Sequence, residues 1–359
     1  MHLAPGLEDP RAWLEQLAGA CPALEHLTLW LPPLGSLVND GALDLTPLAQ
    51  LPSLSHLSVT SQCRAPPMAM ALAVPQGGLV FVPRSAQARF DAGGTKLRSL
   101  VALMLKDVVF SHGPLDSDAR EDRLGETLAA ACPALEVLRL SYGRQRTDLR
   151  LLTGCPRLRD VRLSNCVLSA TSAPSPPALS HLSIHSSCVC GGADLLPLLR
   201  CPRLAELNIS GVRGEALLRF TESLADPAAP ANRSLEKLGL VLNRTASRDV
   251  GAFIGRLPAL RDVTLGCVPG LDVCLDGIDA APALRSVTLD GVKTILGADA
   301  LARCAQTLRL IRLRKSEVGP DLVAALAALS CARGGLAFAF IDCNLDESAL
   351  AHGWTSTSH

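Results

Sequence analysis

The chain has 359 residues, of which 48% are hydrophobic, 19% are charged and 3% are aromatic. This composition supplies a core of aliphatic side chains and excludes a globally disordered chain. Lys and Arg together number 34, as do Asp and Glu, so the chain lacks the basic excess that is typical of a nucleic-acid-binding protein.

The N-terminal segment "EDPRAWLEQLAGACPALEHL" (residues 8–27) predicts a helix followed by a strand. Three acidic residues lie near this start, and no apolar signal core precedes the helix, so we expect no signal peptide. No apolar run reaches the roughly 18 to 20 residues that a membrane helix needs. We therefore expect a cytoplasmic or nuclear protein whose 13 cysteines are reduced thiols.

One hexapeptide, L-x-x-[LVI]-x-[LVI], recurs along the chain. Its eleven copies begin at Leu24, Leu54, Leu100, Leu135, Leu158, Leu179, Leu204, Leu235, Leu260, Leu284 and Leu308. A degenerate copy lies within residues 335–345. The alternation of apolar and polar residues predicts a half-buried strand in each copy. Because one strand cannot bury its apolar side alone, the copies are expected to stack into a parallel sheet.

A proline lies two residues before the first leucine in most copies, and a cysteine often precedes that proline, as in Cys21-Pro22 and Cys201-Pro202. Proline restricts the residue before it and has no amide hydrogen, so each proline is expected to end the preceding helix. The cysteine fits a buried last turn, where a small apolar side chain packs well. Leu51 and Leu257 replace it in other copies, which indicates packing rather than thiol chemistry.

The segments between the strands differ in length and character. Residues 61–95 form the longest insertion, for which we consider a loop or small hairpin on the edge of the array, or a partner-binding element. Two further insertions, residues 111–126 and 225–234, are expected to be solvated loops. Apolar residues three and four apart predict short helices at residues 249–257, 297–306 and 319–330.

The repeated unit Cys-Pro-x-Leu-x-x-Leu-x-Leu resembles the cysteine-containing and ribonuclease-inhibitor-like leucine-rich repeats, over roughly residues 10–345. Such repeats are typical of the substrate-receptor half of F-box/leucine-rich-repeat proteins. The resemblance implies an α/β leucine-rich-repeat solenoid, with a curved parallel sheet on its concave face and short helices and loops on its convex face. We expect one solenoid of about 11 to 12 irregular repeats over residues 1–351, and a flexible tail at residues 352–359. No F-box is seen, and the ninth repeat position, often Asn or Cys in the family, matches only at Cys166 and Asn243.

The candidate binding surface is the concave face, which repeat positions three, five and seven should line. The candidate partner-binding residues are Trp30, His56, Lys106, Arg139, Asp160, Arg162, His181, His185, Glu206, Arg312 and Arg314. Arg139, Arg162 and Asp160 should meet on adjacent strands, as should His26 and His56. Near the end of the chain, "LRLIRLRKSE" places a second group, Arg309, Arg312, Arg314 and Lys315, in one repeat. Both arginine groups could be part of a solvated face, or could hold acidic side chains or phosphates through the planar guanidinium fork.

Catalytic and cofactor motifs are missing from the sequence: it contains no nucleophile elbow, P-loop, metalloprotease helix or dinucleotide fingerprint. We therefore expect no enzymatic activity and no cofactor. The segment "HSSCVCGG" offers His185, Cys188 and Cys190, with Cys201 further on, but a zinc site usually needs two Cys-x2-4-Cys pairs. Structural packing is the preferred interpretation of these residues, with a metal or redox site as the alternative.

The function that these patterns favour is a non-catalytic protein-binding module or scaffold. A narrower hypothesis is a substrate-recognition subunit of an SCF-type ubiquitin ligase, whose F-box another segment or chain would supply. A second hypothesis is a structural subunit of a large assembly. A third, nucleic-acid binding through the late arginine cluster, is disfavoured by the neutral charge and by the scarcity of aromatic rings.

Overall fold

A computed structural model gives the fold as two compact units, unit 1 (Met1–Ser169) and unit 2 (Ala170–His359), which are described separately. The structure describes residues 10–31, 42–61, 86–89, 97–106, 108–111, 128, 131–141, 146–148, 151–164, 167–169, 176–185, 188–190, 196–210, 220, 232–242, 250–332, 336–345 and 347–357.

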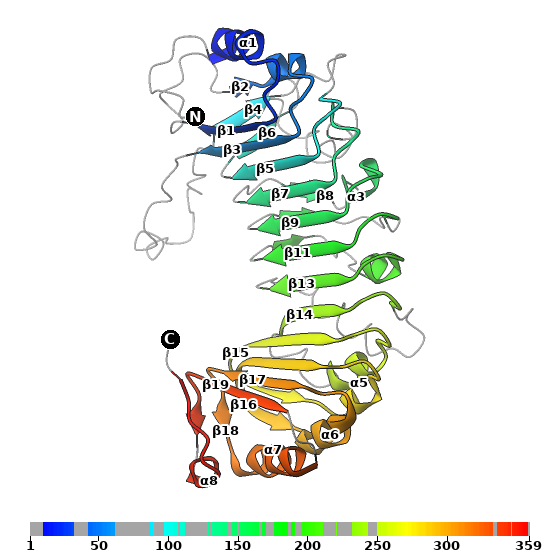
Figure 1. The fold of residues 1–359 in the computed structure, drawn as a ribbon, viewed down its shortest axis with the longest axis vertical. Helices are drawn as coiled ribbons and strands as arrows, with labels where there is room; N and C mark the ends of the chain where they lie inside the picture. The colour runs from blue at the N-terminus through cyan, green and yellow to red at the C-terminus, as the bar shows by residue number, and fades with distance from the viewer. Residues whose placement is uncertain are drawn as a thin grey trace, which may run out of the picture. The chain divides into compact units, whose positions relative to one another are not determined.

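The repeat hexapeptides form the main strands of both units (Figure 1). In unit 1 they are, in spatial order, β1 (His26–Leu31), β3 (His56–Ser61), β5 (Ala102–Lys106), β7 (Val137–Ser141) and β9 (Asp160–Ser164). In unit 2 they are β11 (His181–His185), β13 (Glu206–Ser210), β14 (Lys237–Leu242), β15 (Asp262–Cys274), β16 (Ser286–Leu296), β17 (Leu310–Arg314) and β19 (Ala337–Ile341). The strand β19 comes from the degenerate repeat copy.

Neighbouring main strands pair in parallel without offset, so that each repeat position lies opposite the same position of the next repeat. In unit 1, His56 lies opposite both His26 and Ala102, which are the same position in the flanking repeats. In unit 2, Thr288 is placed in the same way between Thr264 and Arg312. The predicted leucine-rich-repeat solenoid, with its parallel sheet, is therefore confirmed.

Burial alternates along these strands as the hexapeptide predicts. In β7 and β13 the residues at positions four and six are buried, while those at positions three, five and seven are half-buried. Leu29, Leu138 and Leu207 are fully buried. Each buried aliphatic side chain of this size contributes roughly 1.5 to 3 kcal/mol to folding. The stacked leucines are thus the core that holds the repeats together.

The Cys-Pro-x-Leu motif forms a tight turn before each strand. The amide of Leu24 donates to the carbonyl of Cys21 (3.0 Å), and the amide of Leu158 donates to the carbonyl of Cys155 in the same way (3.0 Å). Proline therefore occupies the second position of a four-residue turn, where its fixed φ fits. The α1 helix (Pro10–Ala20) ends immediately before such a turn, as expected from the proline.

The cysteine of this motif is buried only where a repeat covers it. Cys132, Cys155 and Cys201 are at most 2% exposed, and burial raises the pKa of their thiols to about 12, 11 and 12. Cys21 is exposed, contrary to the expected buried position. It follows α1, which belongs to the first repeat and so has a neighbouring repeat on one side only.

Short helices and 3-10 turns return the chain from one strand to the next. The three predicted helices correspond to α5 (Val250–Gly255), α6 (Ala298–Arg303) and α7 (Pro320–Ala332). They lie along one side of unit 2 (Figure 1). The remaining described elements of this kind are α3 (Leu151–Gly154), α8 (Glu347–Ala351), η1 (Thr46–Gln50), η3 (Leu196–Arg200), η4 (Ile278–Ala280) and η5 (Cys304–Gln306).

Short second strands follow several main strands, and these were not predicted. They are β2 (Ala42–Asp44), β4 (Ala86–Arg89), β6 (Val108–Ser111), β8 (Arg146–Asp148), β10 (Val167–Ser169), β12 (Cys188–Cys190), β18 (Glu317–Val318) and β20 (Asn344–Leu345). The strand β4 pairs in parallel with both β2 and β6. The last part of the 61–95 insertion therefore belongs to a regular repeat rather than to a hairpin. Residues 62–85, like most of the 111–126 and 225–234 insertions, lie outside the described residues.

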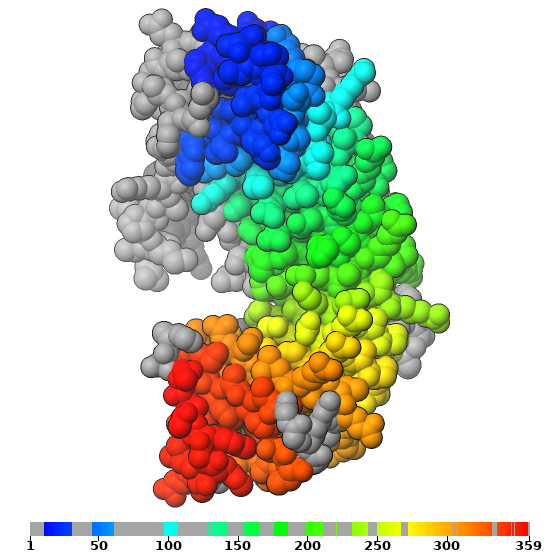
Figure 2. All heavy atoms as spheres, viewed as in Figure 1, coloured from blue at the N-terminus to red at the C-terminus, as the bar shows by residue number. Residues whose placement is uncertain are grey.

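The segment expected to be a flexible tail is bonded to β19 in unit 2. The amide of Thr357 donates to the carbonyl of Phe340 (2.9 Å), and the amide of Asp342 donates to the carbonyl of Thr357 (2.9 Å). The Trp354 ring lies 5.3 Å from the Phe340 ring and 5.7 Å from the Phe338 ring. These contacts place residues 354–357 along the outer edge of β19, in the red segment at the end of unit 2 in Figure 2.

The repeat that begins at Leu235 has Asn232 and Arg233 in place of the cysteine and proline of the turn motif. Asn232 is 3% exposed, and its side-chain amide donates to the carbonyls of Leu199 (3.1 Å) and Cys201 (3.0 Å) in the preceding repeat. Its side-chain oxygen accepts hydrogen bonds from the amide (2.8 Å) and hydroxyl (2.9 Å) of Ser234. Asn232 therefore links two successive turns through polar contacts.

The replacement of Asn232 by Ala should lower the free energy of unfolding by about 1 to 3 kcal/mol, because it removes the buried hydrogen bonds from Asn232 to the carbonyls of Leu199 and Cys201. Urea denaturation followed by circular dichroism measures this change. Arg233→Ala, at the neighbouring exposed turn position, is the matched control and should stay within about 0.5 kcal/mol of the wild type. Equal stabilities of the two variants would contradict the assigned role of Asn232.

The buried cysteines should resist alkylation while the protein is folded, because the reactive species is the thiolate and their pKa values are raised. At pH 8, iodoacetamide should modify the exposed Cys21 and Cys331 and leave Cys132, Cys155 and Cys201 unmodified. Peptide mapping by mass spectrometry reads out each position, and the same reaction in urea is the positive control. Modification of Cys132 at the rate of Cys21 in the native protein would contradict the assigned burial.

Candidate functional site

Positions three, five and seven of the main strands line one side of the sheet in each unit, opposite the leucine core; we call this the polar face. Because neighbouring strands pair without offset, the side chains of the polar face form rows that run across the strands. All eleven residues predicted from the sequence lie on the polar face. Six of them lie in unit 1 and five in unit 2, namely Trp30, His56, Lys106, Arg139, Asp160 and Arg162, and then His181, His185, Glu206, Arg312 and Arg314.

The first two strands of unit 1 bring aromatic side chains together. The rings of His26 and His56 stack with their centroids 4.2 Å apart, as predicted. The Ser55 hydroxyl lies 2.8 Å from Nδ1 of His56 and fixes the orientation of that ring. Trp30, two positions beyond His26 on β1, is a large hydrophobic residue that remains 37% exposed. Aromatic side chains in such a position are typical of protein-binding surfaces.

The strands β7 and β9 place two arginines around one carboxylate in unit 1. Arg139 and Arg162 lie directly opposite each other in the register. Asp160 lies between them, 3.7 Å from Nη2 of Arg139 and 3.5 Å from Nε of Arg162. Lys106 is exposed at the end of the neighbouring strand β5. The group of Arg139, Asp160 and Arg162 therefore carries two cations and one anion, and Lys106 lies on the adjoining strand opposite Ser141.

The Arg139 side chain has an unsatisfied donor. Its Nε is buried and has no acceptor among the described residues. Its guanidinium lies 3.7 Å from the nearest Asp160 oxygen, which is longer than a charged hydrogen bond. A buried polar group without a partner costs about 1 to 3 kcal/mol. The Arg139 side chain as a whole is 40% exposed.

A histidine cluster lies at the start of unit 2. The Nε2 of His185 lies 2.6 Å from the Ser183 hydroxyl, and its Nδ1 is hydrogen-bonded to the Ser210 hydroxyl of the next strand. His181, at the other end of β11, is exposed and lies opposite Glu206 in the register. Both serines lie on the polar face, but they could not be singled out from the sequence, because serine is common at solvated positions.

The last strands of unit 2 hold the second predicted arginine group. Arg314 lies 3.8 Å from the Asp290 carboxylate of β16. Arg312 is half-buried and lies between Thr288 and Ala339 in the register. Arg312 and Arg314 thus lie on the same strand, β17. The two predicted arginine groups belong to different units of the structure.

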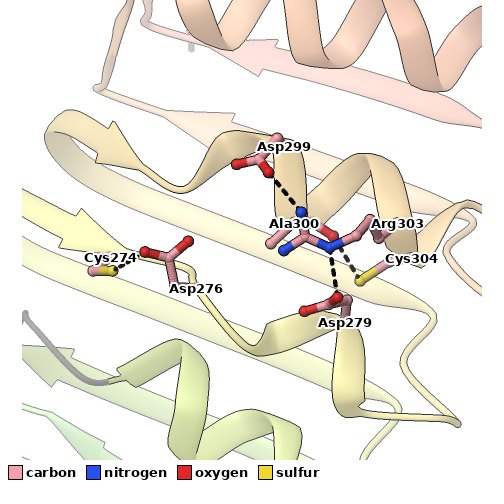
Figure 3. A network of polar contacts seen from close by, with 7 residues as sticks. All are labelled: Cys274, Asp276, Asp279, Asp299, Ala300, Arg303 and Cys304. Atoms are coloured by element: carbon pink, nitrogen blue, oxygen red, sulfur yellow. Dashed lines mark hydrogen bonds and ion pairs between the residues drawn. The ribbon is translucent and has the colours of Figure 1, made fainter.

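A further polar network lies among the return segments of unit 2 (Figure 3). The Arg303 guanidinium donates to Asp279 of η4 (2.6 Å) and to Asp299 of its own helix (2.5 Å). The Cys274 thiol donates to the Asp276 carboxylate (3.3 Å). Hydrogen bonding to Arg303 holds the pKa of Asp279 below its ordinary value. The bond from Arg303 to Asp279 connects two successive return segments, so we assign the network a structural role.

The described residues show neither a metal-binding cluster nor a membrane-spanning helix. No group of three or more His, Cys, Asp or Glu side chains in the described part of the chain could hold a metal ion. Within the same residues, no helix has the length and hydrophobicity to span a bilayer. Cys188 and Cys190 lie on β12, and Cys201 is a buried thiol of the turn motif. His185 is instead held by the two serines.

Comparison with known proteins gives structural similarity only. No family model and no curated protein matches the sequence. One similar solved structure is the leucine-rich-repeat ectodomain of the plant membrane receptor kinase GASSHO1/SCHENGEN3 from Arabidopsis thaliana in complex with CASPARIAN STRIP INTEGRITY FACTOR 2, with 14% identity over 92% of this chain and 40% of that chain, and a TM-score of 0.43.

Two further structures are similar to the same degree. The mouse RP105/MD-1 complex matches with 13% identity over 90% of this chain and 57% of that chain, and a TM-score of 0.45. The plant peptide hormone receptor RGFR1 in complex with RGF2 matches with 13% identity over 92% of this chain and 53% of that chain, and a TM-score of 0.45. This chain spans about half the length of these structures. The assignment of the fold rests on the strand register, since the similarities are low.

The Asp279–Arg303 pair should make stability depend on pH on the acid side. Because the pKa of Asp279 is lower in the folded chain than in the unfolded chain, the pair stabilises the fold above the unfolded value and loses this effect as the pH falls through the folded value. Asp279→Asn should therefore be less stable than the wild type at pH 7, and the difference should disappear in acid. Thermal denaturation between pH 2.5 and 7 measures it, and a difference that persists in acid would contradict the pair's contribution.

Proposed function

We propose that this chain is a non-catalytic protein-binding module that binds its partner on the polar face. The observation that carries the proposal is the cluster of Arg139, Asp160 and Arg162 in unit 1. Two guanidinium groups share one carboxylate at distances of 3.5 Å or more, and one buried donor has no acceptor in the described part of the chain. The Arg139 and Arg162 side chains are 40% and 54% exposed, and a partner's carboxylates could engage such guanidinium groups on a rigid sheet.

The wider polar face supports the same proposal. Most of its charged side chains are exposed or half-buried, and Trp30 adds an apolar anchor that is partly open to solvent. Tryptophan and arginine are enriched among the residues that dominate the energy of protein interfaces. The parallel sheet holds these side chains at fixed spacings, so a partner would meet an ordered surface.

The two narrower roles from the sequence remain predictions. A ubiquitin-ligase subunit would use the same face for its substrate. It would also need a segment that docks to the ligase, and the polar face provides no information about such a segment. A structural subunit of a large assembly would use other surfaces as well. The protein-binding proposal holds for both, because each requires a partner on the array.

Affinity purification from native lysate with quantitative mass spectrometry tests the proposal. The variant Arg139→Glu with Arg162→Glu should capture at least about tenfold less of any specific partner, because it replaces attraction with repulsion on the polar face of unit 1. The matched control is Arg98→Glu with Arg157→Glu, which makes the same charge change at two exposed turn positions of unit 1. This control should retain the partner.

Circular dichroism establishes that both variants are folded before the comparison is made. A partner that the wild type and the face variant capture equally would show that the polar face of unit 1 is not the binding surface. A partner that both variants lose would point to the net charge of the unit rather than to the arginine cluster.

A further inference from the structure

The polar face of unit 2 changes its charge along the sheet. Consider positions two to seven of the last three main strands, β16, β17 and β19, which we call the C-terminal basic face. On the polar face itself these strands carry Arg312, Arg314 and Asp290. Arg285 and Arg309 lie at position two, one residue before β16 and β17 begin, and both are exposed; the five residues together give a formal net charge of +3. The same positions of β11, β13, β14 and β15 carry Lys237, Arg261, Glu206, Glu236 and Asp262, which give −1.

The positive charges of the C-terminal basic face are mostly uncompensated. Its single carboxylate, Asp290, is 3.8 Å from Arg314. Within the part of the chain that the structure describes, Arg285, Arg309 and Arg312 form no ion pair, although Arg261 and Glu236 do pair on the other half of the sheet (3.6 Å). Arg312 is half-buried, so its charge is less well solvated than that of the exposed Arg309. An anionic ligand would relieve this cost.

Apolar side chains lie beside the arginines on the same face. Leu310 and Ala337 face each other across β17 and β19, and Ala339 and Ile341 continue along β19. All four are exposed or half-buried. A ligand that covers this surface therefore meets both guanidinium groups and aliphatic carbon, which matches an extended peptide with acidic and apolar side chains.

Nucleic acid fits this surface less well. Binding of single-stranded nucleic acid uses aromatic rings that stack on bases. The aromatic residues of this region, Phe338 and Phe340, occupy the alternate positions of β19 and so point to the opposite side of the sheet. There they pack against Trp354. The C-terminal basic face offers arginines without a stacking platform.

We propose that the C-terminal basic face binds an acidic, extended peptide segment of a protein partner, with Arg312 as its central cation. This inference rests on the proposed protein-binding function and specifies the chemistry of the partner at a second surface. The planar guanidinium groups of Arg309 and Arg312 hold the carboxylates, and Leu310, Ala337 and Ile341 contact the apolar side chains. The interaction weakens as salt screens the charges.

Fluorescence anisotropy with the purified full chain tests the inference. The probe is a fluorescein-labelled 12-residue peptide of alternating Glu and Leu, and a peptide of alternating Gln and Leu is its neutral counterpart. We expect the acidic peptide to bind and to lose at least fivefold in affinity between 50 and 300 mM NaCl. Arg309→Gln with Arg312→Gln should weaken it at least tenfold. Lys237→Gln with Arg261→Gln, which removes the same charge from the other half of the sheet, should change it less than twofold.

Arg309→Gln and Arg314→Gln, each at an exposed position, carry the test if the double variant is unstable, and each should weaken the peptide at least twofold. Equal binding of the acidic and neutral peptides, no effect of the arginine variants, or tighter binding of an oligouridylate of equal length would overturn the inference. If the acidic peptide does not bind while a lysate partner is still lost on Arg139→Glu with Arg162→Glu, the protein-binding function stands and this inference fails.

Discussion

The in-register stacking of the main strands is the constraint on which the rest of this structure depends. Because each repeat position lies opposite the same position of the next repeat, the buried leucines form rows and the backbone of one strand pairs with that of the next. A shift of one residue in any strand would bring its leucines to the polar face. The hexapeptide can therefore vary freely at three positions and hardly at all at the others.

The same register creates the candidate sites. Residues that are far apart in the sequence, such as Arg139 and Arg162, become neighbours solely because they occupy the fifth position of adjacent repeats. Side chains on a repeat array are thus combined in rows, and a change at one position alters one row without disturbing the core. An array of this kind can acquire a charged or apolar patch one repeat at a time. The two basic groups, one in each unit, differ in their ion pairs. Arg139 and Arg162 both lie near Asp160, whereas among the described residues of β17 Arg314 pairs with Asp290 and Arg312 forms no ion pair.

Much of this could be predicted from the sequence. The repeated hexapeptide predicts the main strands and the rows of the polar face. The prolines before it and the helical spacing of apolar residues predict the turns and three of the return helices. The second strands could not be predicted, since two to four residues such as Glu317 and Val318 carry too little periodicity. Asn232 was missed because its partners are carbonyl groups of another repeat. The Arg303 network depends on how return segments of different lengths meet, which no hexapeptide encodes.

A parallel sheet built from repeats has two open edges, each with a row of backbone groups that can pair with another strand. In unit 2 the segment that ends at Thr357 lies along the edge of β19 and uses part of that row. A further repeat placed after β19 would have to displace this segment and the Trp354 contacts. A repeat inserted between two existing strands would need no such displacement. Lengthening or shortening of this array is therefore easiest from within, by internal duplication or loss, which leaves the covered edge intact.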